Sequence, residues 1–167
     1  MNKRFFAFII ITFLLVGRSF GQTAAEMNTK LAAIVDSVTA ISGDWKEKMG
    51  ELKEGSKHFE ELKTLRAHLD VVIDKETANL KKAKDVFESN RYRAGVLALL
   101  TYEKQMVTAA YAPFEKLKPT ATDDQVKACN DKLDDMARKE DELRAEVNSA
   151  QAEFAKENKL TIEGGGE

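Results

Sequence analysis

Residues 122–154 read TDDQVKACNDKLDDMARKEDELRAEVNSAQAEF, and this stretch decides the fold. Its apolar residues recur at alternating intervals of three and four positions over four heptads, which is the period of a helix that packs against other helices. Glu140 is the one polar residue within this stripe. We therefore predict a long, charged, amphipathic helix over residues 122–160. The apolar positions of the stripe are Val126, Cys129, Leu133, Met136, Leu143, Val147, Ala150 and Phe154.

The charged residues of the same segment are arranged to support a helix. Three acidic residues each stand four positions before a basic residue, and a pair of this kind stabilises a helix by about 0.2–0.5 kcal/mol. Ahead of them, Thr122 is a predicted N-cap, and two aspartates follow it at the positive end of the helix dipole. The three pairs are Asp134–Arg138, Asp135–Lys139 and Glu140–Arg144.

Upstream of this segment the apolar residues keep a helical period, and turn chemistry predicts the breaks between helices. The sequence Ser42-Gly43-Asp44 offers a glycine stop followed by an aspartate N-cap. Ser89-Asn90 suits a turn, because asparagine tolerates the left-handed conformation. Pro113 is expected to kink or restart its helix, because it lacks the N–H that a helix interior needs. We predict helices near residues 23–41, 44–89, 91–118 and 122–160.

The chain is thus predicted to be all-α, because residues 22–160 contain no clean alternation of polar and apolar residues of the kind typical of a strand. We expect an elongated antiparallel bundle with coiled-coil-like packing, built from three long helices and a shorter N-terminal one. Residues 22–160 would form this single domain. Residues 161–167 include three consecutive glycines and are expected to form a flexible tail.

The N-terminus has the pattern of a secretory signal peptide. Two basic residues precede residues 5–16, which carry no charge and span about 18 Å as a helix, well short of the roughly 30 Å of a bilayer core. Small residues favour cleavage after Gly21, with a weaker alternative after Ala25. A retained membrane anchor is the other interpretation. We therefore predict a signal peptide over residues 1–21 and a periplasmic or extracellular location.

Charge excludes one class of partner. The chain carries 26 basic and 28 acidic residues, and removal of residues 1–21 takes away three basic residues and leaves 23 against 28. A mature chain of net charge near -5 lacks the basic footprint of a nucleic-acid-binding protein. We expect no nucleic acid partner, and no stable membrane insertion after signal cleavage. A protein partner, including a second copy of this chain, agrees with the long apolar stripe.

The two histidines are candidate metal ligands only by their spacing. Glu54, His58, Glu61 and His68 would share one face of a continuous helix. Di-iron bundles need a histidine three residues after a glutamate on two helices, and neither His58 nor His68 has a glutamate at that position. An exposed polar face is the alternative, and we predict no metal and no other cofactor.

Three glutamates fall at or near the apolar stripes of different predicted helices: Glu76, Glu103 and Glu140. Carboxyl groups that converge inside a bundle raise one another's pKa and can perform acid-base chemistry or hold a cation. The alternative is that each glutamate packs its methylene groups at the edge of a stripe and extends its carboxylate into water. The sequence leaves both interpretations open.

No pattern of a catalytic nucleophile is present. The chain lacks the GxSxG, SxxK, HExxH, Walker and GxGxxG motifs, and its single Cys129 stands at a core-type position without a nearby histidine. Cys129 is therefore either a packed thiol or, in an oxidising compartment, one half of an intermolecular disulfide. We predict no catalytic residues and a protein that is not an enzyme.

The aromatic residues fall on or beside the apolar stripes, so core packing is their expected role. Tyr102, Tyr111 and Phe114 have a second interpretation as a surface patch beside Pro113. The function that these observations favour is action through protein contacts, as a scaffold, an adaptor or an envelope component. The alternatives are a holdase-like periplasmic chaperone and, less favoured, a carrier of a small ligand or a metal.

Overall fold

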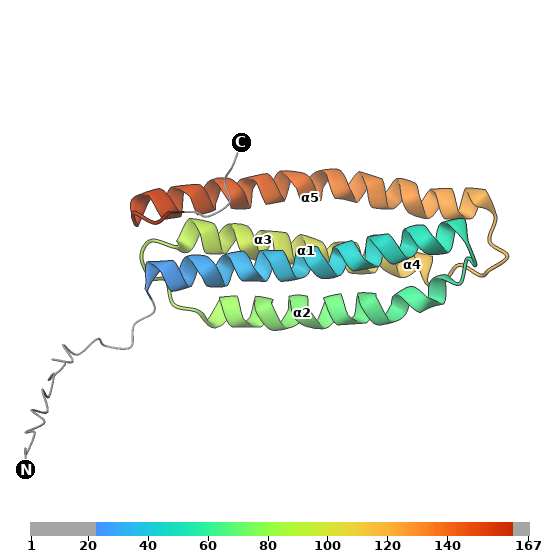
Figure 1. Ribbon diagram of the computed structural model, residues 1–167, viewed down its shortest axis with the longest axis horizontal. Helices are drawn as coiled ribbons and strands as arrows, with labels where there is room; N and C mark the ends of the chain where they lie inside the picture. The colour runs from blue at the N-terminus through green and yellow to red at the C-terminus, as the bar shows by residue number, and fades with distance from the viewer. Residues whose placement is uncertain (1–22, 162–167) are drawn as a thin grey trace, which may run out of the picture.

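The computed structural model describes residues 23–161, and in this range the chain is all-α and contains no strand. Four long helices lie side by side along the molecule and alternate in direction (Figure 1). The predicted antiparallel helical bundle is confirmed. The predicted signal peptide, residues 1–21, and residues 162–167 of the predicted tail lie outside the described residues. The long helices are α1 (Ala24–Glu54), α2 (Leu62–Lys82), α3 (Asn90–Met106) and α5 (Asp123–Glu157).

The predicted break at Ser42-Gly43-Asp44 is wrong, because α1 runs through it without interruption. Ser42 faces the core, is 2% exposed, and its hydroxyl donates to the carbonyl oxygen of Thr39 at 3.0 Å. The apolar stripe then continues with Trp45, which is fully buried. The N-terminal helix is therefore not the shortest of the four long helices: it has 31 residues, whereas α2 has 21 and α3 has 17.

The first connection lies at Gly55 instead, and it divides the predicted helix 44–89. The backbone N–H of Lys57 donates to the carbonyl oxygen of Leu52 at 2.9 Å, and Lys57 itself adopts a left-handed conformation with φ 54°. A bond that reaches five residues back closes a helix and satisfies a carbonyl of its last turn. A short 3-10 turn, η1 (Phe59–Glu61), then leads into α2.

The second connection spans residues 83–89, so the turn predicted at Ser89-Asn90 is present but begins earlier in the chain. The guanidinium of Arg93 donates to the carbonyl oxygen of Ala83 at 2.5 Å, and the Ser89 hydroxyl donates to Asp85 at 3.1 Å. Phe87 has φ 55° and is 47% exposed. This loop lies beside the C-terminal end of α5, where Asn158 donates to the Phe87 carbonyl oxygen at 3.3 Å.

Pro113 restarts its helix, as predicted. A π-helical turn, η2 (Val107–Tyr111), follows α3 and precedes the short α4 (Ala112–Phe114). The N–H of Ala112 donates to the carbonyl oxygen of Val107, five residues back, so the wider turn relieves the crowding that a proline ring imposes on a regular helix. The same turn directs Ala110 and Tyr111 into the core.

The last helix, α5, begins as predicted. The Thr122 hydroxyl accepts the Gln125 N–H at 3.3 Å, and the Gln125 side chain accepts the Thr122 N–H at 3.0 Å, which completes a capping box. Of the predicted charge pairs, Glu140–Arg144 is present. The other two are wrong, because the two basic residues pair at a spacing of three. Arg138 pairs with Asp135 and Lys139 pairs with Glu142.

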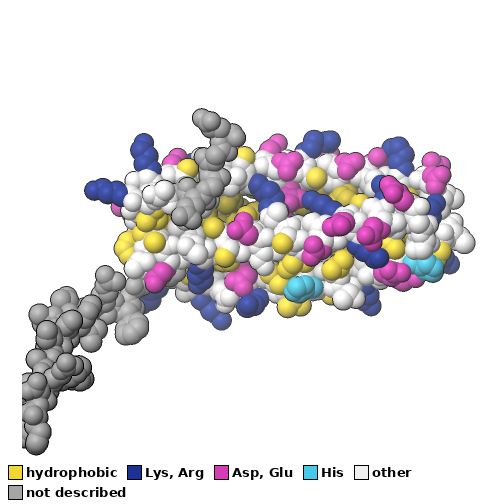
Figure 2. Space-filling model, viewed as in Figure 1, with side chains coloured by type: hydrophobic (Ala, Val, Ile, Leu, Met, Phe, Trp, Pro, Cys, Tyr) yellow, Lys and Arg dark blue, Asp and Glu magenta, His cyan; other side chains and the backbone are white. Residues whose placement is uncertain are grey.

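The four helices do not pack equally closely. α1 lies mainly against α2, and α5 lies mainly against α3, whereas α1 and α5 approach each other closely at few positions. Charged side chains follow the line between these two helices (Figure 2). Among the described residues, no helix is long and apolar enough to cross a membrane.

Candidate functional site

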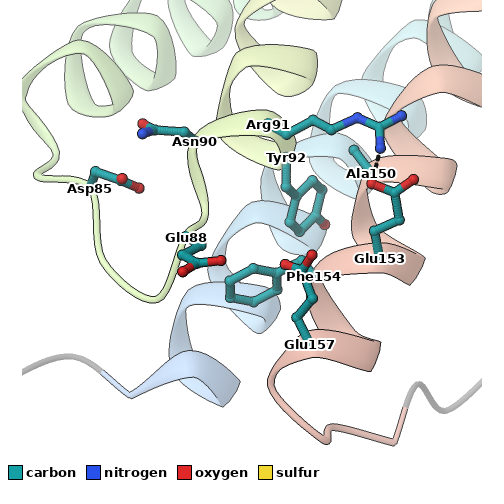
Figure 3. Close-up of a pocket in the computed structure, with 9 residues that line it drawn as sticks. All are labelled: Asp85, Glu88, Asn90, Arg91, Tyr92, Ala150, Glu153, Phe154 and Glu157. Atoms are coloured by element: carbon teal, nitrogen blue, oxygen red, sulfur yellow. Dashed lines mark ion pairs between the residues drawn. The ribbon is translucent and has the colours of Figure 1, made fainter.

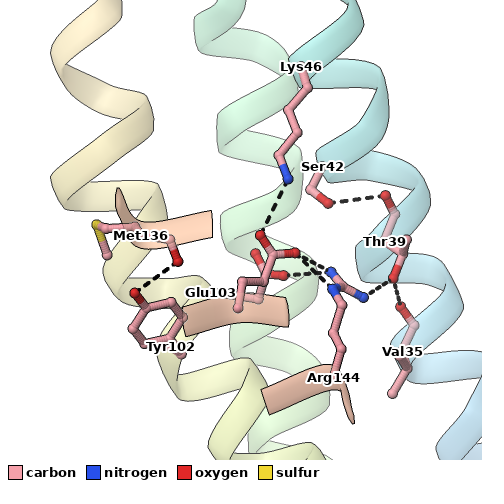
Figure 4. A network of polar contacts seen from close by, with 9 residues as sticks. Val35, Thr39, Ser42, Lys46, Tyr102, Glu103, Met136 and Arg144 are labelled. Carbon is pink, nitrogen blue, oxygen red and sulfur yellow. Dashed lines mark hydrogen bonds and ion pairs between the residues drawn. The ribbon is translucent and has the colours of Figure 1, made fainter. Parts of the chain in front are cut away.

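The most unusual feature of the bundle is a cluster of charged residues inside it. Glu103 on α3 is 0% exposed, and Glu140 occupies the one polar position in the α5 stripe and is 3% exposed. Arg144 stands one helical turn after Glu140, so its guanidinium reaches the same place. Lys46 and Thr39 approach from α1 (Figure 4). We call these five residues the polar cluster.

Arg144 joins three helices of the bundle. Its Nε donates to Oε1 of Glu140 at 2.8 Å, and its Nη2 donates to the same oxygen at 2.5 Å and to Oε1 of Glu103 at 2.9 Å. Its Nη1 donates to the hydroxyl of Thr39 on α1. A planar guanidinium has five N–H donors in a fixed arrangement, which is what contact with three partners requires.

The two carboxyl groups are not equally satisfied. Both oxygens of Glu140 accept hydrogen bonds, because Nζ of Lys46 approaches Oε2 at 3.3 Å. Glu103 has one partner, Arg144, on Oε1, and its Oε2 is buried without any N–H donor. A buried carboxylate oxygen without a donor is costly, whereas a protonated carboxyl group can itself donate from that oxygen.

The environment separates the pKa values of the two glutamates. Burial and, after it, the neighbouring Glu140 carboxylate together raise the pKa of Glu103 to about 8, against the opposing charges of Arg144 and Lys46. Burial would also raise the pKa of Glu140, but the hydrogen bond from Arg144 and the charge of Lys46 outweigh it and lower that pKa. Near neutral pH the proton is therefore on Glu103 and the negative charge is on Glu140.

An aromatic cluster lies against the polar cluster. The ring of Trp45 stacks on Tyr111 with centroids 4.2 Å apart, and Phe114 meets Trp45 edge-on at 5.6 Å. The Tyr111 hydroxyl and the Trp45 indole N–H are buried without hydrogen bond partners. Burial, followed by the charges of Glu103 and Glu140, raises the pKa of Tyr111 far above its usual value.

The surface patch considered for Tyr102, Tyr111 and Phe114 does not exist. Tyr111 and Phe114 are fully buried, because the π-helical turn rotates them inward. Tyr102 is half-buried, and its hydroxyl donates to the carbonyl oxygen of Met136 at 3.1 Å (Figure 4). The core-packing interpretation is confirmed for these residues.

The histidines do not come together. α1 ends at Glu54 and the connection follows, so the continuous helical face that would join His58 to His68 is not formed. His58 is exposed, and its Nδ1 lies 2.7 Å from a carboxylate oxygen of Glu60. His68 is exposed on α2. Among residues 23–161, no group of three or more potential ligands is placed to hold a metal ion.

The remaining candidates lie apart from the polar cluster. Glu76 is on α2, where it accepts from Asn79 at 3.1 Å and pairs with Lys75, so it does not converge with the other two glutamates. Cys129 is half-buried against the core, and burial raises the pKa of its thiol, which disfavours the reactive thiolate near neutral pH.

A recess of about 270 Å³ opens at the end of the bundle where the α2–α3 connection meets α5 (Figure 3). Acidic side chains surround it, and Arg91 pairs with Glu153 across it. The rings of Tyr92 and Phe154, with centroids 6.0 Å apart, lie beneath. Its volume is smaller than the roughly 300–1,000 Å³ of typical small-molecule pockets. The recess therefore gives little support to the small-ligand carrier.

Comparison of the chain with models of known protein families, with curated proteins and with solved structures gives no match.

The sequence indicated part of the polar cluster. Glu103 and Glu140 were recognised from their positions in apolar stripes, and the structure brings these two together. Arg144, Lys46 and Thr39 were missed as parts of an internal site. The available signal was the Glu140–Arg144 pair, because an arginine four residues after a core-facing glutamate is on nearly the same side of the helix.

Proposed function

We propose that this protein is an exported, non-enzymatic helical bundle that acts through contacts with other proteins, as a scaffold, an adaptor or an envelope component. The observation that carries the proposal is an exposed hydrophobic residue on the outward side of α2. Val71 is 65% exposed there, the most exposed of the large hydrophobic side chains in residues 23–161. Hydrophobic atoms are visible among the side chains over α2 (Figure 2).

Val71 belongs to a stripe with helix-packing periodicity. Thr64, Ala67 and Ala78 are exposed on the same side of α2. With Val71 and position 74, they recur at alternating intervals of three and four residues, as the contact positions of a heptad do. The remaining heptad position is Asp74, whose carboxylate is held by Lys104 of α3 at 2.8 Å. Apart from Asp74, the stripe consists of small, uncharged side chains around one aliphatic residue, which suits close contact with the apolar face of a partner helix.

Site-specific photo-crosslinking in cells tests this surface. A photoreactive residue at position 71 is expected to capture one defined protein, or a second copy of this chain, because the α2 stripe would lie within the contact. The matched control carries the same residue at position 138, since Arg138 is exposed on α5, away from α2. Identical products from both positions, or none from position 71, would contradict a contact at α2.

Export is tested independently by the mass of the mature protein. We expect the chain recovered from the extracytoplasmic fraction to begin at Gln22, because Ser19 and Gly21 provide the small residues that signal cleavage needs. A mass that corresponds to a start at Glu26 would move the cleavage site and leave export intact. A mass that still includes residues 1–21 would refute the secretory signal.

A holdase-like chaperone is the second candidate, and the weak packing between α1 and α5 is the observation that favours it. Helices that separate there would offer two apolar faces to an unfolded chain. The crosslinking experiment distinguishes the two candidates. A holdase would crosslink to many client proteins when the photoreactive residue stands at a position that faces the core, and it would capture no single partner from position 71.

A further inference from the structure

The boundary between α1 and α5, which we call the α1–α5 seam, is the place where the bundle can open most easily. Three connections join α1 to α2, α2 to α3 and α3 to α5, so no loop joins α1 to α5, the first and last of the four long helices (Figure 1). These two helices also approach each other closely at few positions. Separation at this seam therefore leaves both helical hairpins, α1–α2 and α3–α5, intact.

The bonds that cross the seam are polar along its whole length. At one end, Gln151 donates to Asn28 at 3.3 Å. At the other end, Lys53 donates to Asn130 at 3.3 Å, and Lys57, just after α1, pairs with Asp123 at 3.1 Å. The two lysine contacts are exposed and contribute little, because water screens them.

The polar cluster, in the middle of the seam, has buried partners. The side chain of Glu140 is 4% exposed and that of Arg144 is 19% exposed, and they reach across to Lys46 and Thr39 of α1. Electrostatic interactions strengthen as water is excluded. The polar cluster is therefore the part of the seam that holds α1 against α5.

We propose that the polar cluster is a proton-controlled latch: protonated Glu103 keeps the α1–α5 seam closed, and loss of that proton lets α1 separate from α5. This inference goes beyond the proposed function and does not depend on which partner the protein contacts.

The groups that face Glu103 explain the direction of the effect. From α5 come the Glu140 carboxylate and Arg144, from α1 comes Lys46, and from η2 comes the neutral Tyr111 hydroxyl. On α2, Asp70 and Asp74 are paired instead with Lys104, at 2.6 and 2.8 Å.

With the proton in place, Glu103 is neutral, and its carboxyl group can donate from Oε2, the oxygen that lacks an N–H donor. Arg144 and Lys46 then both pair with Glu140, which carries the single negative charge of the polar cluster. After the proton leaves, Oε2 of Glu103 becomes a charged, buried oxygen without a donor, next to a second carboxylate. Water would relieve this charge, and water enters where the bonds between helices are weakest.

The sign of the pH dependence follows from proton binding. The closed form holds the proton with a pKa raised to about 8, whereas an exposed glutamate in the open form has its ordinary pKa near 4.3. The closed form therefore binds more protons between these values, and its stability relative to the open form falls as the pH rises through this range. Above the raised pKa of Glu103, the proton no longer stabilises the closed form relative to the open form.

Trp45 is a built-in reporter for the latch. It is the single tryptophan of the chain, is fully buried against Tyr111, and precedes Lys46 on α1. We propose to measure acrylamide quenching of its fluorescence from about pH 6 to about pH 9, with far-UV circular dichroism as the measure of helix content. Quenching is expected to increase several-fold as the pH rises to about 8 and to level off above that pH, while the helix content stays constant.

Two variants and one control make the test specific. Glu103→Gln retains the shape of the side chain without its titration, so its quenching should stay low across the range. Glu140→Gln removes the neighbouring carboxylate that raises the pKa of Glu103. The quenching transition of this variant should therefore lie at a lower pH than that of the wild type. Glu76→Gln is the control, because Glu76 lies outside the polar cluster, and it should behave as the wild type.

Four results would overturn the proposal. One is wild-type quenching that does not change with pH. Another is a transition in Glu103→Gln as steep as that of the wild type. The third is a quenching transition in Glu140→Gln at the same pH as in the wild type. This comparison tests the proposal even if Glu103→Gln does not fold. The fourth is a loss of helix content that coincides with the quenching, because that describes global unfolding and not the opening of a seam.

Discussion

Replacement of Arg144 by alanine is expected to lower the free energy of unfolding by about 3–5 kcal/mol at neutral pH, because it leaves a buried charge without its main partner. Glu140 would keep Lys46 alone, whose ammonium is 3.3 Å away and whose side chain is 39% exposed. Glu103 would lose the N–H that its Oε1 accepts. Urea denaturation followed by circular dichroism measures the change.

The matched control for this prediction is Arg138→Ala on the same helix. Arg138 also bonds a carboxylate, that of Asp135 at 2.5 Å, but both side chains are mostly exposed. The expected change is below about 0.5 kcal/mol, because exposed ion pairs are screened by water. Equal losses for Arg144→Ala and Arg138→Ala would show that burial of the polar cluster has no energetic consequence.

A bundle does not need buried charges for stability. Hydrophobic residues of similar volume in place of a buried ion cluster are often neutral or stabilising. The polar cluster instead has a geometric consequence, since Arg144 must meet Glu103 and Thr39 at the same time, which fixes the register of α5 against α3 and α1. A slip by one turn would leave these groups buried and unpaired.

The overall class of the fold follows from the heptad rhythm alone. Stripes such as Val126 to Phe154 have a meaning that does not depend on their neighbours, because one apolar face on each helix must be buried. Charge pairing was less predictable at the level of single residues. Arg138 can reach either Asp134 or Asp135 with little difference in energy, because pairs at spacings of three and four residues are both neighbours on a helix.

The error at Ser42-Gly43-Asp44 has a clear physical origin. Glycine weakens a helix by about 1 kcal/mol, which local reasoning interpreted as a stop. In the bundle, burial of Trp45 and Met49 on the same stripe outweighs this local preference, and Gly43 faces open space where nothing requires a turn. The actual end at Gly55 is followed by Lys57 in the left-handed conformation.

Only part of the candidate site could be predicted from the sequence, because the rest depends on how the helices are placed beside one another. A sequence shows which residues interrupt an apolar stripe, and this identified Glu103 and Glu140. It does not show which neighbouring helix each one faces, so Glu76 was grouped with them although it pairs on the surface of α2. Lys46 and Thr39 were not recognisable, because they are ordinary surface residue types that contribute only through the position of α1 beside α5.

Replacement of Trp45 by alanine is expected to lower the free energy of unfolding by about 3–5 kcal/mol, the usual cost of removing a large buried aromatic side chain. Trp45 is fully buried, stacks on Tyr111 at 4.2 Å and meets Phe114 at 5.6 Å, so two aromatic residues would lose contacts and face a cavity. Thermal and urea denaturation of the variant measure the loss.

Trp45→Phe separates packing from polarity at the same position. The indole N–H of Trp45 is buried without a hydrogen bond partner, and such a group costs about 1–3 kcal/mol. Phenylalanine removes this donor and keeps one ring against Tyr111, so the two effects offset each other and we expect a net loss below about 1.5 kcal/mol. A loss as large as that of Trp45→Ala would mean that the indole N–H has a partner within the polar cluster, and that the aromatic and charged groups form one hydrogen-bonded unit.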